Sequence, residues 1–253
     1  MATETLNQPD GTHAPEDPVG LSRELLAAAR ALDGAVTPEL TRLSGALGSV
    51  DPSRLPDDPS RVAFWVNVYN ALMRHAIAAW GLRGSLMTTL GVFQRAAYSL
   101  QGRRYPLHLI EHAILRRNRP APWTFWRPAR EDDPRLRSMP ASLDPRVHFA
   151  LNCGAVSCPP IRSYGAAELD RQLTTATRSY LASEVVVEAA RARVRLPYLC
   201  SLYRGDFPPG DALLGWVAPF LDPGEARAFL EKPPRRPKVS FGAYHWSIVP
   251  KVE

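Results

Sequence analysis

One stretch, from Asp58 to Trp80, constrains the fold more than any other part of the chain. Its apolar residues surround the predicted helix almost completely instead of forming a stripe, so the helix has to be buried. Asp58 or a neighbour can cap its start, and Gly81 can end it. Because the chain has 253 residues, of which 45% are hydrophobic, it is long enough to build one large core around such a helix.

Three polar side chains interrupt this apolar helix and share one of its faces. Asn67, Asn70 and Arg74 are three and four residues apart, the spacing of neighbours on a helix surface. A buried amide without partners costs about 1–3 kcal/mol, so polar groups must meet this face. Two interpretations stay open: the side chains hold neighbouring backbone, or they line or support a site. In the second case, Arg74 and Trp65 are expected to contact a substrate.

The remaining predicted elements are shorter, and most of them are helices. The predicted fold class is α+β, a mostly helical single domain over residues 19–253 with a small antiparallel sheet. Residues 1–18 are rich in Pro and acidic side chains and are expected to form a disordered tail. Hydrophobic spacing predicts helices over 21–32, 38–47, 166–183, 211–221 and 224–231, and β-branched runs predict a hairpin over 185–196 and a final strand over 239–249.

A short segment around Cys153 carries the most reactive side chain. Val147, Phe149 and Leu151 alternate with other positions, which predicts a half-buried strand ending in a turn at Gly154. Cys153 then lies where the strand stops, held by ordered backbone and able to face a cleft. The segment therefore predicts a thiol nucleophile at Cys153.

A cysteine nucleophile needs a base or a positive environment, because the thiolate is the attacking species. His112 is the candidate base. Glu111, Asn67 or Asn70 could fix the tautomer of its imidazole, and an Asn from the long helix suits that role better, since adjacent residues on a helix point in different directions.

The substrate side of this site is predicted around the same turn. The backbone N–H groups of Cys153 and Gly154, together with the Asn152 amide, could stabilise the oxyanion of an acyl-transfer intermediate. His148 precedes Cys153 by five residues, about 16 Å along a straight strand, so we expect it to support the site instead of acting as the base. These features favour a cysteine-dependent hydrolase or acyltransferase that acts on an amide, ester or thioester.

Three motifs of the chain resemble the domain of unknown function family five-four-seven, which is widespread in bacteria and plants. The resemblance runs from about Leu55 to Val249. It implies functional positions at both Asn residues of the first motif, at the Glu-His pair of the second and at the Cys-Gly pair of the third. The motifs are Phe64-Trp65-Val66-Asn67-Val68-Tyr69-Asn70-Ala71-Leu72, Ile110-Glu111-His112-Ala113-Ile114-Leu115-Arg116 and His148-Phe149-Ala150-Leu151-Asn152-Cys153-Gly154.

Two positions distinguish this chain from the family pattern. Plant-type members have serine at the position of Cys158, which favours Cys153 as the reactive thiol. Near the end, relatives tend to read Tyr-Asp-Trp-Ser-Leu-Asn, whereas this chain has His245 between Tyr244 and Trp246. Some members of the family are joined to coiled-coil or glutaredoxin-like modules. Such fusions would also permit a protein-interaction role for this domain.

Other functions stay open beside the hydrolase. The second is a non-catalytic protein-interaction or ligand-binding module with a structural cysteine. The third is thiol redox chemistry between Cys153 and Cys158, although their spacing is CxxxxC and not the CxxC of thioredoxin-like proteins. Because His112 precedes Cys153, a papain-like or transglutaminase-like site would have to be permuted or convergent.

His108 and His112 have the spacing of two zinc ligands, but no third ligand is evident, so neither a metal nor another cofactor is expected.

The net charge and the targeting signals limit which partners are expected. The net charge is +6 with a pI near 9.5, but no nucleic-acid motif accompanies it, so nucleic acid is not an expected partner.

The long irregular loop 117–143 is expected to be a packed flap or a lid. No apolar run of about 18 residues and no signal peptide is evident, so we expect a cytoplasmic protein without a membrane partner. Arginines around the loop favour a small-molecule, acyl or peptide substrate that is anionic or carrier-bound: Arg103, Arg104, Arg127, Arg130, Arg135 and Arg137.

Overall fold

The computed structural model describes residues 5–9, 11, 14–89 and 91–248, and it is organised around helix α3 (Asp58–Ala79). Asp57 caps this helix by accepting a hydrogen bond from the backbone N–H of Ser60 at 2.8 Å, as expected for an acidic N-cap. Most of the helix is buried, and the exposed fraction of Trp65 is 0%. The prediction of a central buried helix is confirmed.

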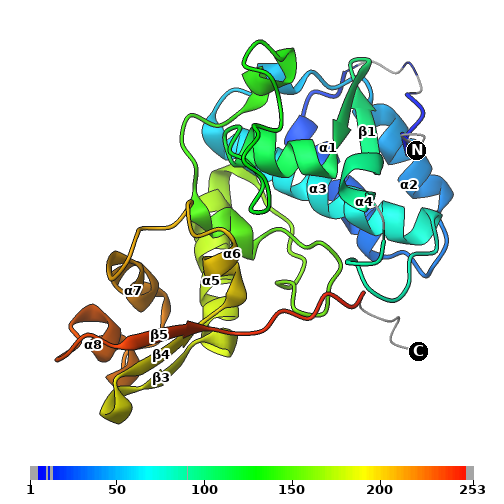
Figure 1. The fold of residues 1–253 in the computed structure, drawn as a ribbon. Coiled ribbons are helices and arrows are strands. Elements are labelled where there is room, and N and C mark those ends of the chain that lie inside the picture. Colours follow the sequence, from blue (N-terminus) through cyan, green and yellow to red (C-terminus); the bar gives the residue numbers. More distant parts are fainter. Residues whose placement is uncertain (1–4, 10, 12–13, 90, 249–253) are drawn as a thin grey trace.

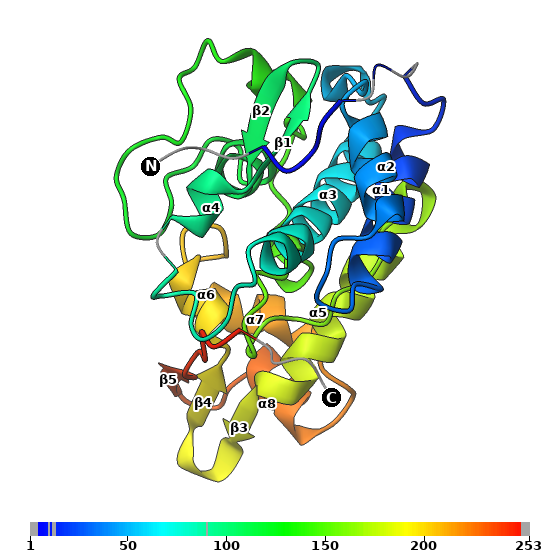
Figure 2. The same cartoon turned by 90° about the vertical axis from the view of Figure 1, so that its right-hand side faces the viewer.

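The N-terminal half of the chain packs around α3. Helices α1 (Pro18–Arg30) and α2 (Pro38–Leu47) lie on one side of it. The short helix α4 (Val92–Arg95) and the antiparallel hairpin of β1 (Ala97–Leu100) and β2 (Arg103–Pro106) lie on the other side (Figure 2). The predicted helices over 21–32 and 38–47 are confirmed.

The C-terminal half forms a second group of elements, at the lower left of Figure 1. A three-stranded sheet lies among its helices, with β3 antiparallel and β5 parallel to the central β4. The predicted hairpin is confirmed, whereas the last strand is shorter than expected. The elements are α5 (Leu169–Glu184), β3 (Val186–Glu188), β4 (Arg193–Leu196), α6 (Tyr198–Leu202), α7 (Ala212–Val217), α8 (Glu225–Glu231) and β5 (Lys238–Phe241).

Single turns of other helix types connect these elements. One of them, η2 (Leu109–Leu115), is a π-helix, in which the N–H groups of Arg116 and Asn118 donate to carbonyls five residues earlier at 2.9 and 2.8 Å. Such turns occur frequently at functional sites. The 3-10 turns are η1 (Pro52–Arg54), η3 (Pro134–Ser138), η4 (Pro145–Phe149), η5 (Ala166–Glu168), η6 (Ala189–Arg191) and η7 (Ala218–Phe220).

Two apolar cores lie side by side in the domain. The larger surrounds α3, and the smaller fills the space among α5–α8 and β3–β5. Tyr244 packs against both, and Cys153 and Cys158 pack against the larger one, so the cysteines lie near the junction. The fold is the predicted α+β type, mostly helical with small sheets. Among the described residues, no helix is both long and apolar enough to cross a membrane.

The strand predicted over 147–151 is wrong. Residues Pro145–Phe149 form the 3-10 turn η4, which Asp144 caps by accepting from the backbone N–H of Arg146 at 2.9 Å. An acidic N-cap followed by proline is a strong helix-start signal, and here it overrides the alternation of apolar residues. The predicted turn at Gly154 is present, with φ at +86°.

Part of the segment expected to be a disordered tail is instead packed on the domain. The N–H of Leu6 donates to the Ala97 carbonyl at 2.9 Å. Asn7 is 3% exposed, and its amide bonds both the N–H and the C=O of Ser99 in β1 and the C=O of Ser44 in α2. A single buried amide thus satisfies backbone groups of two elements, which composition alone does not reveal.

Candidate functional site

Asn70 holds the loop that carries the two cysteines. Its Nδ2 donates to the Ala150 carbonyl at 2.9 Å, and its Oδ1 accepts from the N–H of Asn152 at 2.8 Å. Asn152 continues the brace, because its Oδ1 accepts from the N–H of Gly154 and its Nδ2 donates to the Pro159 carbonyl, both at 2.8 Å. The Asn152 amide therefore shapes the loop from within.

Asn67 forms the same kind of brace elsewhere. Its amide bonds the C=O and the N–H of Tyr164 at 2.8 and 3.0 Å, and its Nδ2 also donates to the Ser22 hydroxyl. The first interpretation of this helix face, that it holds neighbouring backbone, describes both asparagines. The backbone that Asn70 holds belongs to the cysteine loop, so Asn70 both holds neighbouring backbone and supports the candidate site.

Gly154 is the residue that this loop requires at its turn. Its φ of +86° is a left-handed conformation that side chains disfavour. An added Cβ would also lie 2.6 Å from Cδ1 of Ile77 on α3. The backbone next to Cys153 therefore packs closely on the central helix.

The sulfur atoms of Cys153 and Cys158 are in contact. The Sγ–Sγ distance is 3.1 Å, and the N–H of Cys153 donates to the Cys158 sulfur at 3.1 Å. The Tyr244 hydroxyl lies 3.2 Å from the Cys158 sulfur and 3.7 Å from that of Cys153. Cys158 thus has three hydrogen-bond partners that favour a thiolate.

The pKa values of the Cys153 and Cys158 thiols are shifted in opposite directions. The hydrogen bond to Cys158, followed by burial, raises the pKa of Cys153. Burial also acts to raise the pKa of Cys158, but the hydrogen bonds from Cys153 and Tyr244 outweigh it, and the pKa of Cys158 is lowered. Cys158 is therefore the more acidic thiol of the pair, and the role of Cys153 as the nucleophile stays a prediction.

A small cavity of about 30 Å³ adjoins the sulfurs. A volume of this size holds a water molecule and is too small to enclose a whole acyl or peptide substrate. The sequence-predicted residues Glu111, His148 and Cys153 are brought together around it. The full lining is Tyr69, Glu111, His148, Leu151, Cys153, Cys158, Pro159, Leu199, Tyr203 and Tyr244.

Glu111 is a buried carboxylate clamped by two phenols. The hydroxyl of Tyr203 donates to it at 2.6 Å and that of Tyr69 at 2.9 Å. Burial acts to raise the pKa of Glu111, but His112 and the Tyr203 hydrogen bond lower it below its ordinary value. The lining of the cavity thus includes a buried negative charge as well as the two sulfurs.

His112 is paired with Arg116 in the structure. Its Nδ1 lies 2.9 Å from Nη1 of Arg116 and 3.8 Å from Oε1 of Glu111. Since guanidinium can only donate, Nδ1 accepts and the ring proton lies on Nε2. Among the described residues, none of the hydrogen bonds joins His112 to either cysteine, so the Cys153–His112 pair stays a prediction.

A buried ion network continues from Arg116 to His148. Arg116 Nε lies 2.5 Å from Oδ2 of Asp206, and the same oxygen lies 2.9 Å from Nε2 of His148. Burial acts to raise the pKa of Asp206, but its bonds to His148 and Arg116 lower it. His148 also stacks on the ring of Tyr203 at 3.9 Å. Its expected supporting role stays a prediction.

Four of the five predicted substrate residues do not line the cavity: Trp65, Arg74, Asn152 and Gly154. Trp65 is fully buried in the core, against Phe64 and Tyr105. Arg74 has a buried Nε without a hydrogen-bond partner among the described residues. Conversely, sequence reasoning missed Asp206 and Tyr244 as site residues, because they lie far from the motifs along the chain.

The two histidines considered as metal ligands are stacked edge to face. The rings of His108 and His112 are 4.7 Å apart. Within the ranges that the structure describes, no group of three or more His, Cys, Asp or Glu side chains is placed to hold a metal ion.

We predict that acid destabilises the fold through its buried histidines. Burial lowers the pKa of His112 and of His75 from 6.5 to about 4. The unfolded chain therefore binds protons first as the pH falls below 6.5, and stability declines from there towards pH 4, by about 1.4 kcal/mol for each pKa unit of the shift. Urea unfolding at pH 7 and pH 5 measures the decline, and His75→Gln should reduce it. Equal unfolding free energies at both pH values would contradict the prediction.

We also predict that the two asparagine braces differ in effect. Asn70→Ala and Asn67→Ala each leave buried backbone groups unpaired and should lower the free energy of unfolding by about 2–3 kcal/mol. Only Asn70→Ala should also slow alkylation of Cys158 at pH 7, because it releases the loop that brings the Cys153 N–H to that sulfur. Equal alkylation rates in the two variants would show that Asn70 does not position the thiols.

A comparison with family models finds one that covers the part of the site before residue 182. The family described as "Protein of unknown function, DUF547" matches residues 52–181, a range from η1 to α5 that includes Asn70, Glu111, His112 and both loop cysteines. The resemblance seen in the motifs is thereby confirmed. No curated protein and no solved structure matches the chain.

Proposed function

This chain belongs to the DUF547 family, whose description assigns no activity, and from its own side chains we propose that it acts as a thiol redox protein. In this proposal Cys153 and Cys158 cycle between two thiols and one disulfide. The observation that carries it is the Sγ–Sγ contact of 3.1 Å, about 1 Å longer than a disulfide bond.

The reaction begins at Cys158, the more acidic thiol. Its thiolate attacks one sulfur of a partner disulfide, which forms a mixed disulfide and releases one partner thiolate. Cys153 then loses its proton and attacks the Cys158 sulfur, which forms the internal disulfide and releases the second partner thiolate. The protein loses two electrons and two protons, and the partner disulfide becomes two thiols.

The surrounding groups fit this exchange. The Tyr244 hydroxyl and the Cys153 N–H lower the pKa of Cys158, which increases the thiolate fraction at neutral pH. Cys153, Cys158 and Cys200 are unpaired in the structure, and a reduced pair can act as a donor of electrons in a reducing compartment.

A cysteine hydrolase or acyltransferase is the second candidate. The lowered pKa of Cys158 favours it, because the same thiolate could attack an ester or thioester. Two features favour the redox function instead. The cavity is small, and the Nδ1 of the predicted base His112 already accepts a hydrogen bond from Arg116.

Reaction with hydroxyethyl disulfide tests the proposal. Mass spectrometry of the reduced protein should find the internal disulfide as the end product, with no adduct retained. Cys153→Ser should instead accumulate a mixed disulfide at Cys158, because the second step lacks its nucleophile. If the wild-type protein keeps the adduct as long as Cys153→Ser does, the redox proposal is wrong. Thioester hydrolysis by the reduced protein, absent in Cys158→Ser, would then support the second candidate.

A further inference from the structure

Three aromatic side chains are exposed together in the loop after η2. Trp123, Phe125 and Trp126 have exposed fractions of 58%, 97% and 83%. Folded domains seldom expose a group of large apolar side chains unless it serves an interaction. Phe125 is almost entirely free of protein contact, so it does not lie in a groove of this chain.

The loop that carries these aromatics has a rigid base. Asn118 is 4% exposed, and its amide bonds both the N–H and the C=O of Ala129, at 3.0 and 2.9 Å. Arg116 adds a bond to the Pro120 carbonyl at 2.8 Å. The two ends of the loop are therefore closed against each other. Phe125 and Trp126 are almost fully exposed on it, whereas the Trp123 ring packs edge to face on His112, with ring centres 6.0 Å apart.

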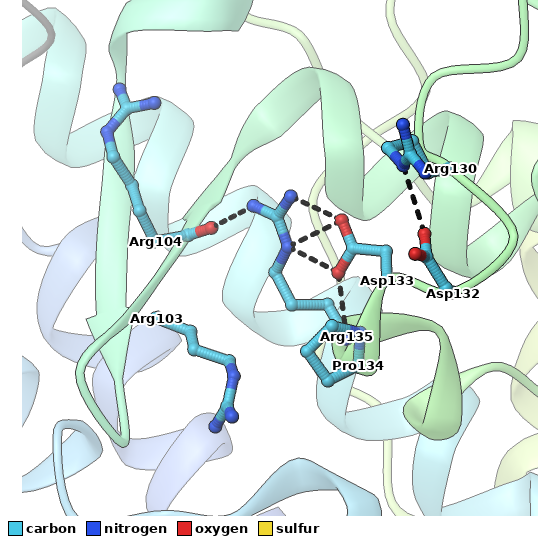
Figure 3. Close-up of a pocket in the computed structure, with 7 residues that line it drawn as sticks. All are labelled: Arg103, Arg104, Arg130, Asp132, Asp133, Pro134 and Arg135. Atoms are coloured by element: carbon cyan, nitrogen blue, oxygen red, sulfur yellow. Dashed lines mark hydrogen bonds and ion pairs between the residues drawn. The ribbon is translucent and has the colours of Figure 1, made fainter.

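A recess lined with arginines begins four residues after Trp126. It has a volume of about 460 Å³. Figure 3 shows Arg103 and Arg104 of β2 on one side, Arg130 on the other and Arg135 between them, bonded to Asp133. Chain length alone keeps the Cα atoms of Trp126 and Arg130 within about 14 Å of each other, so the aromatics and the recess are adjacent.

Positive charge dominates this surface. Residues 117–137 contain six arginines and three carboxylates. Asp133 pairs with Arg135, and Asp132 pairs with Arg130 in an exposed contact. Among the described residues, no hydrogen bond or ion pair involves the Arg103 guanidinium. The cations are thus only partly neutralised within the protein.

We propose that this aromatic and arginine-rich surface binds the face of an anionic lipid bilayer. Trp and Phe side chains suit the boundary between headgroups and acyl chains, and neighbouring arginines suit lipid phosphates. A protruding Phe without a groove around it fits insertion into lipid better than docking on a shaped protein. This proposal departs from the expectation of no membrane partner, which rests on the absence of an apolar run long enough to span a bilayer.

Co-sedimentation with vesicles tests this proposal. The full chain should bind vesicles of phosphatidylglycerol and phosphatidylcholine much more strongly than vesicles of phosphatidylcholine alone, and added salt should weaken the binding. The double variant Phe125→Ser/Trp126→Ser should reduce the partition coefficient at least about tenfold, since burial of one aromatic side chain is worth more than that factor. Phe241→Ser is the matched control, because Phe241 is a 42% exposed aromatic residue on β5, and it should leave binding unchanged.

A charge variant tests the arginines separately. Arg103→Glu/Arg130→Glu should weaken binding to the anionic vesicles and reduce its salt dependence, with an unchanged melting temperature. The proposal is overturned if the wild-type protein does not bind anionic vesicles at low salt, or if the aromatic double variant binds as well as the wild type. It is also overturned if the wild type self-associates in solution and the double variant is monomeric, because the surface would then join copies of the chain.

Discussion

Replacing Asp206 with alanine is expected to lower the free energy of unfolding by about 3–5 kcal/mol, the usual cost of breaking a buried ion pair. The side chains of Asp206 and His148 are 1% exposed and that of Arg116 is 5% exposed. Without the carboxylate, the guanidinium of Arg116 remains buried next to His112 with no negative partner at its Nε. Urea unfolding at pH 7 measures the loss.

The matched control is a carboxylate in an exposed pair. Asp132 pairs with Arg130, and both side chains are more than 70% exposed, so Asp132→Ala should change the unfolding free energy by less than about 1 kcal/mol. Asp206→Asn should fall between wild type and Asp206→Ala, because an amide keeps part of the hydrogen bonding. A cost for Asp206→Ala no larger than that of Asp132→Ala would show that the buried network does not stabilise the fold.

Replacing Cys158 with serine is expected to slow alkylation of the loop thiols at pH 7 by more than about tenfold, because the thiolate carries the reaction. Cys153 remains, but burial still raises its pKa, and it cannot replace the lost thiolate. Iodoacetamide labelling, followed by mass spectrometry at each cysteine, gives the rates.

Cys200→Ser serves as the control for this experiment. Cys200 is fully buried, and burial raises its pKa to about 12, so its removal should leave the labelling rate at Cys158 unchanged. If the loop thiols of Cys158→Ser were labelled as fast as those of the wild type, Cys153 would be the reactive thiol, as the motifs first suggested.

The sequence contained enough information to predict the frame of this fold. The all-round apolar character of α3 determined that it is central, and the cost of burying Asn67 and Asn70 determined that polar groups meet them. The glycine after Cys153 marked a real turn. These predictions succeeded because each rests on a local, large energy term: burial, an unpaired amide or a positive φ.

The failures arose where two local signals competed or where partners were distant. The alternation around Phe149 indicated a strand, but the Asp144-Pro145 start favoured a 3-10 turn. His112 is the predicted base of Cys153, and that pair stays a prediction; the contact of its Nδ1 with Arg116, one turn later, was not foreseen. The roles of Asp206 and Tyr244 depend on contacts with residues at least 58 positions away, which no periodicity can reveal.

A redox titration of the native protein tests the central proposal most directly. The protein is equilibrated in mixtures of reduced and oxidised dithiothreitol, and the remaining thiols are alkylated and located by mass spectrometry. The account predicts that Cys153 and Cys158 leave the alkylated pool together in one transition, while Cys200 stays reduced. If both loop cysteines remain alkylated thiols in the most oxidising mixture, with the fold intact, the pair is not a redox centre.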